Sequence, residues 1–443
     1  MTKDMTTGSP LRIILLFSIP VLLGNLFQQF YNMVDTIIVG RYLGEEALAA
    51  VGSTGCLMFL VLGFANGIAQ GFGVMVSHAF GAKDFKLLRH YVALSLILTL
   101  IISLLLTIPT VTASRLLLAW MHTPENIIAM ADAYIKVIFA GILLTMAYNV
   151  LSGILRGIGD SRTPLYFLIL SSVLNIILDV VLIVYTGLGT AGAAYATIIA
   201  QGVSAVLCFF YMYRKYDILR TRHEDYYLDS AGVKNMLAIG VPMALNYSIT
   251  AIGTMIMQSA VNVFGSSVVA AFTAASKVSN IATQSMPTLG TAMATYCGQN
   301  LGAGKYDRIY AGMRQGLFLC FGAAATAAAI CIFGGRFIVS NPSEEIFSSA
   351  MQYLTIASWF FLPLAMIFLY RNALQGLDQG LIPMLSGVIE LACRFGVIAL
   401  IPASTGFFGV CFADPAAWAG AGIPLFITYL LWEHRMKQCS KAA

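Results

Sequence analysis

Two acidic residues stand inside long apolar stretches of the sequence. Asp35 lies within YNMVDTIIVG and Asp179 within NIILDVVLIV. Asn32 precedes Asp35 by three residues and Asn175 precedes Asp179 by four, so on a helix each amide shares a face with its carboxylate. Carboxylate and amide oxygens suit a small hard cation, and a carboxylate can also take a proton. The pattern predicts a cation-handling site on two helices. The alternative is a structural role, in which Asp35 bonds a buried polar neighbour such as Tyr31.

The composition is that of a membrane protein. Of 443 residues, 59% are hydrophobic and only 10% are charged, and the mean hydropathy is +0.82. Soluble domains carry about 25% charged residues, far more than this chain. A charged side chain at the centre of a bilayer costs at least about 2.5 kcal/mol, so acids retained there usually have a function or a partner.

The hydropathy pattern predicts an all-α fold with twelve membrane-spanning helices, because a helical span needs roughly 20 apolar residues. The predicted spans are 12–40, 47–80, 87–110, 126–156, 163–186, 189–213, 235–263, 267–300, 309–333, 345–375, 381–402 and 405–432. Lys and Arg gather in the connections on one side, with only Arg41, Arg115 and Arg336 on the other. This bias predicts a multi-pass protein of the cytoplasmic (inner) cell membrane with both termini cytoplasmic. It also accounts for most of the net charge of +5, which indicates no nucleic-acid partner.

The second half of the sequence repeats the first. The stretch AFGAKDFKLLRHY (79–91) matches NLGAGKYDRIY (300–310), and LRGIGDSRTP (155–164) matches LQGLDQGLIP (374–383). The two matches have offsets of 221 and 219 residues. Since each half holds six spans, both halves enter the membrane from the same side and the repeats are parallel. We expect an N-lobe (1–213), a cytoplasmic linker (214–234) and a C-lobe (235–443), with the two lobes around a central cleft.

The two deep acids of the first half are absent from the second. Pro20 and Pro242 open corresponding segments at an offset of 222 residues, at which Asp35 corresponds to Met257. At the offset of 219 residues Asp179 corresponds to Ile398. The shared scaffold therefore does not require these carboxylates, which favours a function particular to the first half.

The second half carries other charges at membrane depth. Glu390 and Arg394 are four residues apart, with the acid first, which is the order that a helical ion pair prefers. They form either a structural pair, with Lys277 as a further partner, or part of a substrate site. Asp414 precedes Pro415, so we expect it to cap or break a helix, with a cation site as the alternative.

The assembled motifs resemble the multidrug and toxic compound extrusion (MATE) family over essentially the whole chain. The resemblance rests on the Asp before TIIVGRYLG, on LRGIGDSRTP after the fourth span, and on twelve spans in two repeats. It implies an alternating-access antiporter that exports organic, often cationic, compounds while sodium ions or protons enter. The implied coupling site consists of Asp35, Asp179, Asn175, Thr197, Asn149 and Asn32, and a sodium ion would be held by Asp35, Asp179, Asn175 and Thr197.

A substrate cleft is expected beside the coupling site. Its candidate residues are Tyr31, Gln258, Met257, Lys277, Gln284, Glu390 and Arg394. The expected partners are small organic cations or amphipathic compounds and the lipid bilayer, and we expect a monomer. Apart from the coupling ion, no cofactor and no catalytic residue is expected.

The sequence also bears on three other functions. A flippase for a lipid-linked saccharide would place several cationic side chains in the cleft, and Lys277, Arg371 and Arg394 keep that reading open. An enzyme is disfavoured, because all five His fall at helix ends or in loops and no H-E-x-x-H motif occurs. ATP-driven transport is disfavoured by the absence of a G-x-x-x-x-G-K-[ST] loop.

Overall fold

The chain folds into helices. The computed structural model describes residues 4–335 and 344–442, and within these ranges it contains no strand. The prediction of an all-α membrane fold is confirmed. Arg336, which was assigned to the outer side, lies outside the described residues. The chain divides into two compact units: Ile19–Tyr247 make up nearly all of the first, and Met5–Ser18 with the residues from Ser248 onward make up the second.

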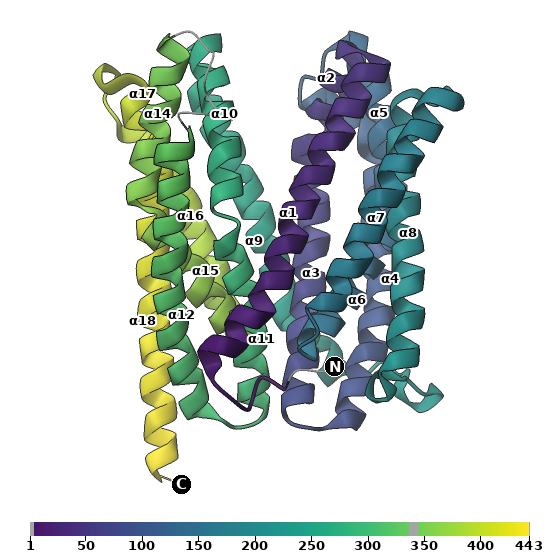
Figure 1. The fold of residues 1–443 in the computed structure, drawn as a ribbon, viewed down its shortest axis with the longest axis vertical. Coiled ribbons are helices and arrows are strands. Elements are labelled where there is room, and N and C mark those ends of the chain that lie inside the picture. Colours follow the sequence, from purple (N-terminus) through teal and green to yellow (C-terminus); the bar gives the residue numbers. More distant parts are fainter. Residues whose placement is uncertain (1–3, 336–343, 443) are drawn as a thin grey trace. The chain divides into compact units, whose positions relative to one another are not determined.

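The first unit contains seven complete α-helices and parts of two more (Figure 1). Its elements are most of α1 (Pro10–Leu43), α2 (Glu45–Ser53), α3 (Gly55–Gly81), α4 (Phe85–Trp120), α5 (Glu125–Ala140), α6 (Ile142–Gly157), α7 (Arg162–Val180) with the π-helical turn η1 (Val181–Tyr185), α8 (Gly189–Lys215), the short turns η2 (Asp217–Leu219) and η3 (His223–Asp225), and the start of α9 (Ser230–Asn262). Helix α6 is central, since it packs against α3, α4 and α8.

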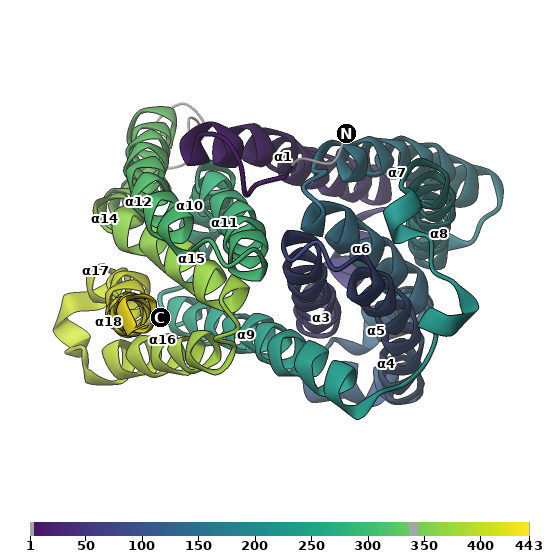
Figure 2. The same ribbon diagram turned by 90° about the horizontal axis from the view of Figure 1, so that it is seen from below.

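The second unit repeats this arrangement. Its elements are the start of α1, the end of α9, α10 (Ser266–Ala282), α11 (Ser285–Gly302), α12 (Tyr306–Ala329) with the π-helical turn η4 (Ile330–Gly334), α14 (Glu344–Trp359), α15 (Phe361–Gly376), α16 (Leu381–Leu400), the turn η5 (Ala403–Thr405), α17 (Gly406–Val410) and α18 (Ala413–Ala442). Helix α15 is the counterpart of α6, and it lies beside α11, α12 and α18 (Figure 2).

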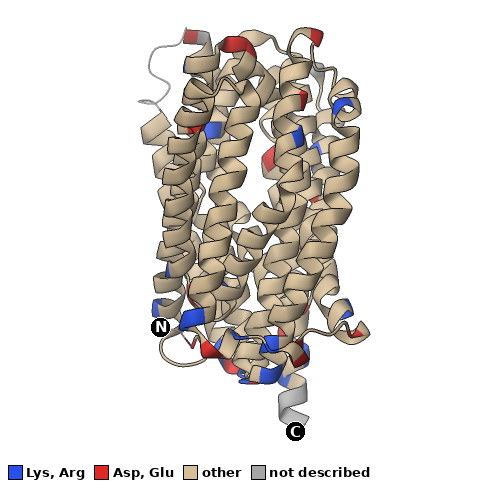
Figure 3. Cartoon of the chain, turned by 90° about the vertical axis from the view of Figure 1, so that its right-hand side faces the viewer, with Lys and Arg blue, Asp and Glu red and all other residues tan. Residues whose placement is uncertain are grey.

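The predicted spans are found as helices, although several are broken. Among the described residues, nine helices are long and apolar enough to cross a membrane, and two bent pairs bring the number to eleven. The pairs are α5 with α6, bent by 47°, and α14 with α15, bent by 52°. The predicted span 267–300 is divided between α10 and α11, which do not belong to that set of eleven. Charged residues gather near the helix ends and leave the middles largely uncharged (Figure 3).

The bend between α5 and α6 lies at a glycine that is close to α8. Gly141 separates the two helices, and a Cβ at this position would lie 2.5 Å from the Ile198 side chain of α8. The glycine therefore lets the bend approach α8 closely, as a larger residue would not.

Small residues allow the helices to touch along their backbones. A Cβ added to Gly71 of α3 would lie 2.4 Å from the Cα of Gly240 in α9, within the first unit. On another face of α3, a Cβ at Gly157 of α6 would lie 2.8 Å from the Gly73 carbonyl oxygen. The equivalent crossing in the second unit joins Gly376 of α15 to Ala294 of α11. Close backbone approach through small residues is a usual way for membrane helices to pack.

The linker before α9 is tied to the first unit by a charged cluster. The His90 ring contacts the Asp229 carboxylate at 2.7 Å and the Asp225 carbonyl oxygen at 3.1 Å, and Tyr227 stacks on it. Asp229 caps α9 by accepting a hydrogen bond from the Gly232 amide. The Gly232 amide and, less strongly, His90 lower the pKa of Asp229.

Candidate functional site

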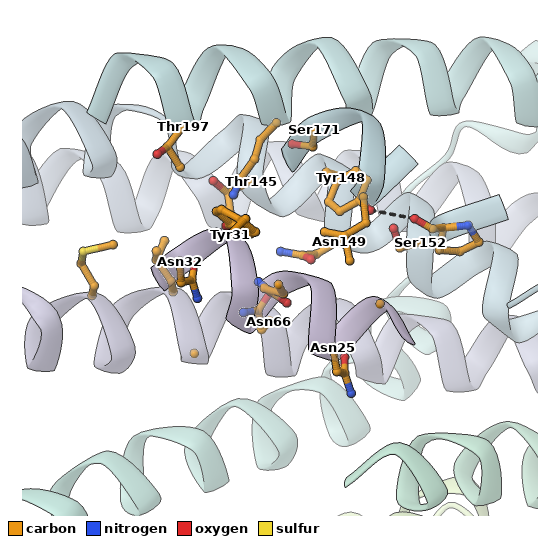
Figure 4. A pocket seen from close by; sticks show the side chains of 18 of the residues that line it. Asn25, Tyr31, Asn32, Asn66, Thr145, Tyr148, Asn149, Ser152, Ser171 and Thr197 are labelled. Atoms are coloured by element: carbon orange, nitrogen blue, oxygen red, sulfur yellow. Dashed lines mark hydrogen bonds between the residues drawn. The ribbon is translucent and has the colours of Figure 1, made fainter. Parts of the chain in front are cut away.

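The first unit encloses a cavity of about 550 Å³. Side chains from α1, α3, α5, α6, α7, α8 and the start of α9 line it, and many of them are polar (Figure 4). Because every lining residue belongs to the first unit, the cavity is a property of that unit alone.

The polar lining comes from stripes on the individual helices. On α1 and α6 the polar residues recur every three or four positions, which places each set on one helical face. The stripes are Asn25, Gln28, Asn32 and Asp35 on α1, and Thr145, Asn149, Ser152 and Arg156 on α6. Asn66 and Gln70 on α3, and Thr197 and Gln201 on α8, add two shorter stripes. Membrane helices present such faces to water or to a polar ligand and not to lipid.

The two predicted acids are neighbours. Asp35 lines the cavity, whereas Asp179 lies behind it on α7 and is 0% exposed. The two carboxyl groups are within hydrogen-bonding reach of each other. Two ionised carboxylates have no hydrogen to share, so a proton or a cation between them is needed to make this contact favourable.

Several buried oxygens around these acids have no hydrogen-bond donor among the described residues. They are Oδ1 of Asp35, both carboxylate oxygens of Asp179 and Oδ1 of Asn175. The Asn175 amide nitrogen donates to the Thr197 hydroxyl at 3.3 Å, which turns the amide oxygen to the other side. Buried polar atoms normally have partners, and a group of orphaned oxygens points to a missing proton or ion. The donor set, two carboxylates with amide and hydroxyl oxygens, fits a sodium ion as well as a proton.

The remaining predicted coupling residues, Asn32 and Asn149, line the cavity without a hydrogen bond to either acid among the described residues. Asn32 is exposed to the cavity one turn before Asp35, and Asn149 lies on the α6 stripe. Figure 4 shows both side chains in the cavity wall, with Tyr31 between Asn149 and Thr197. Tyr31, predicted for the substrate cleft, therefore lies in this cavity too.

The charged residues of the second unit form a closed network. Glu390 accepts hydrogen bonds from Arg371 at 2.8 Å and from Arg394 at 3.1 Å. Arg394 also donates to Asp414 at 2.8 Å. The predicted pairing of Glu390 with Arg394 is confirmed, but the expected further partner, Lys277, was wrong: it is exposed, and Arg371 takes its place because it reaches Glu390 from the adjacent helix α15.

Asp414 has a different role from the one expected. It lies in the first turn of α18, but its carboxylate is engaged by Arg394 and by the Tyr353 hydroxyl. The charges of two arginines and two acids thus balance each other. Glu390 is 7% exposed and Arg394 is 6% exposed. This arrangement is a structural element and leaves no spare charge for a ligand.

The other residues predicted for the substrate cleft are dispersed in the second unit. Met257 is buried in α9, Gln258 donates to Asn262 one turn later, and Gln284 precedes the start of α11.

Sequence reasoning missed most of the polar lining. Arg156, Gln201, Tyr134 and the Gln70–Tyr247 hydrogen bond of 2.6 Å were not singled out. The signal was present, because the three-and-four spacing of the stripes on α1 and α6 can be read directly from the sequence.

Comparison with known proteins gives a consistent result. The MatE family model matches residues 20–181 and 242–400. The chain is 33% identical over 310 residues to the probable multidrug resistance protein YpnP of Bacillus subtilis (strain 168), covering 69% of this chain and 68% of that protein. It is 30% identical over 368 residues to the probable multidrug resistance protein YoeA of the same organism, covering 80% and 77%. A crystal structure described as MATE in complex with MaL6 has the same fold, with a TM-score of 0.91 and 23% identity over 99% of this chain and 100% of that one.

Proposed function

Because this chain belongs to the MatE (multidrug and toxic compound extrusion) family, we propose that it exports small organic compounds from the cell in exchange for sodium ions or protons. The similar proteins of Bacillus subtilis are named as probable multidrug resistance proteins, which supports an efflux role. The proposed activity is transport and not catalysis. The proposed location is the cytoplasmic membrane, with both termini on the inner side.

One observation carries the ion coupling. Asp35 and Asp179 adjoin each other beside a polar cavity, and their buried oxygens have no donor among the described residues. An occupied site and an empty site would differ strongly in electrostatic energy, and a ligand shifts a conformational equilibrium by its difference in affinity for the two states. We propose that the cation binds between these carboxylates, with Asn175 and Thr197 supplying further oxygens.

The contacts of the second unit engage two of the three cations on which the flippase alternative rests. A pyrophosphate group would need cationic side chains that are available to it. Arg371 and Arg394 are instead both committed to Glu390, and Arg394 also to Asp414.

The test uses the purified chain in proteoliposomes loaded with rhodamine B ethyl ester, a cationic dye. A sodium gradient and a proton gradient are imposed separately, and dye efflux is followed by fluorescence. We expect one of the gradients to drive efflux, and Asp35→Asn and Asp179→Asn each to reduce it to the level of empty liposomes.

Glu46→Gln is the matched control, because it removes an exposed acid from the same unit. Efflux by Asp35→Asn at the rate of the unaltered protein would contradict the coupling role, and efflux that needs neither gradient would contradict antiport.

A further inference from the structure

Arg156 brings a positive charge to one end of the cavity. It lies in the last turn of α6, one turn beyond Ser152. It lines the cavity together with Ser161, which directly precedes α7, and Pro164 in the first turn of α7. Its Nε donates to the Ser152 carbonyl oxygen at 3.2 Å. Tyr148 and Tyr247 line the same cavity, where the Tyr148 hydroxyl donates to the Pro164 carbonyl oxygen at 3.0 Å and the Tyr247 hydroxyl accepts from Gln70 at 2.6 Å.

No acid neutralises Arg156 among the residues that the structure describes. The nearest acid in the sequence, Asp160, is committed elsewhere, since it accepts hydrogen bonds from Thr163 and Tyr216. A guanidinium group has five N–H donors, of which the bond to Ser152 uses one. The group is therefore available to an acceptor in the cavity.

The repeat provides an independent argument. In the match between LRGIGDSRTP and LQGLDQGLIP, Arg156 corresponds to Gln375, which is 2% exposed at the end of α15. The same helix end is thus built without a cation in the second unit. A favourable interaction of Arg156 with the α6 dipole cannot explain why the charge is retained there, because α15 ends equally well with a neutral side chain.

The Arg156 guanidinium lies far from the paired acids Asp35 and Asp179. Along α6, the rise over the eleven steps from Thr145 to Arg156 is roughly 16 Å. Figure 4 shows Thr197, which contacts Asn175 beside the acids, and Ser152 at opposite sides of the cavity. An anion held by Arg156 would therefore not occupy the proposed cation site.

We propose that the Arg156 end of the cavity is an anion subsite, which binds the carboxylate or phosphate group of an organic substrate. The planar guanidinium can donate two parallel hydrogen bonds to either group, and Ser161 also lines this cavity. The substrate class then includes zwitterions and organic anions as well as cations. This inference rests on the proposed export of organic compounds, but the subsite is tested by binding alone.

The experiment measures equilibrium binding to the purified full chain by fluorescence anisotropy, without any ion gradient. The probes are rhodamine B, which has a free carboxylate, and rhodamine B ethyl ester, in which only that group is blocked. We expect Arg156→Gln, which installs the residue of the second repeat, to raise the ratio of the rhodamine B Kd to the ester Kd about tenfold or more. Arg156→Lys should restore part of the ratio because it retains the charge but not the two parallel donors.

Arg162→Gln is the control, since Arg162 is exposed six residues away and does not line the cavity. An Arg156→Gln ratio equal to that of this control would overturn the subsite, as would failure of the unaltered protein to bind rhodamine B. Displacement of rhodamine B by free glycerol phosphate would support a soluble organic anion as the ligand, and displacement by phosphatidylglycerol in mixed micelles would support a lipid headgroup. Binding that depends on Arg156 in a protein without gradient-driven efflux would support the subsite while refuting the proposed antiport.

Discussion

The charge network of the second unit predicts which pairs of substitutions rescue each other. In Glu390→Gln, Arg371 loses the one acid that it contacts among the described residues and retains the Ser386 hydroxyl at 3.3 Å, whereas Arg394 still contacts Asp414. Leaving one buried charge without its partner costs about 3–5 kcal/mol. Since a change of 1 kcal/mol shifts the unfolding temperature by about 2–4 °C in a unit of this size, we expect a decrease of roughly 6–20 °C.

The second substitution distinguishes the network from a simple pair. Adding Arg371→Met to Glu390→Gln removes the orphaned charge and leaves Arg394 with Asp414, so most of the stability should return. Adding Arg394→Met instead leaves both Arg371 and Asp414 without an oppositely charged partner, and stability should fall further.

The assay is thermal unfolding of the purified chain in detergent, followed by tryptophan fluorescence. The reasoning is refuted if the variant with Glu390→Gln and Arg394→Met unfolds at a higher temperature than the variant with Glu390→Gln and Arg371→Met.

Two further predictions concern the first unit. Gly71→Ala should lower the unfolding temperature markedly, because the added Cβ would lie 2.4 Å from the Gly240 backbone. The control Gly52→Ala should not, because there is open space around Gly52. Equal effects of the two substitutions would contradict the close crossing of α3 and α9. Asp229→Ala should cost about 1 kcal/mol near neutral pH through loss of the α9 cap. Because the pKa of Asp229 is lowered in the folded protein, its stabilising contribution is present above its ordinary pKa of about 3.9 and is lost as the pH falls through the lower, folded value. The difference in unfolding temperature between the unaltered protein and Asp229→Ala should therefore stay constant from neutral pH down to about pH 5 and shrink only in stronger acid, a trend that the exposed control Asp217→Ala should lack.

The sequence predicts the helices well because apolar length is a local property. It does not predict the breaks within them. The stretch around Gly141 is as apolar as an unbroken span, and the bend follows from its approach to Ile198, a contact with a distant part of the chain. The sharing of α1 and α9 between the two units likewise has no local signal, although Pro20 and Pro242 lie near the points of change.

For the candidate site, too, the sequence predicts the local features and not the contacts between helices. The spacing of Asn175 and Asp179 is enough to place them on one helical face, and the repeat indicates that Asp35 is special to the first half. Which partner a charged side chain meets across helices is a tertiary property. Arg371 instead of Lys277 beside Glu390, and Arg394 beside Asp414, could not be read from spacing within one helix.

The two repeats treat buried charge in opposite ways, and this contrast bears on where coupling resides. In the second unit each of the acids Glu390 and Asp414 is matched by an arginine within 3.1 Å, so no cation is needed to make the network stable. In the first unit the two acids face each other without any base among the described residues, so their electrostatic energy depends on what binds between them. Only the arrangement in the first unit changes its electrostatic energy greatly when a sodium ion or proton binds. The repeat at the level of the backbone thus supplies a common scaffold, and the proposed coupling arises where one copy of that scaffold leaves its acids unmatched.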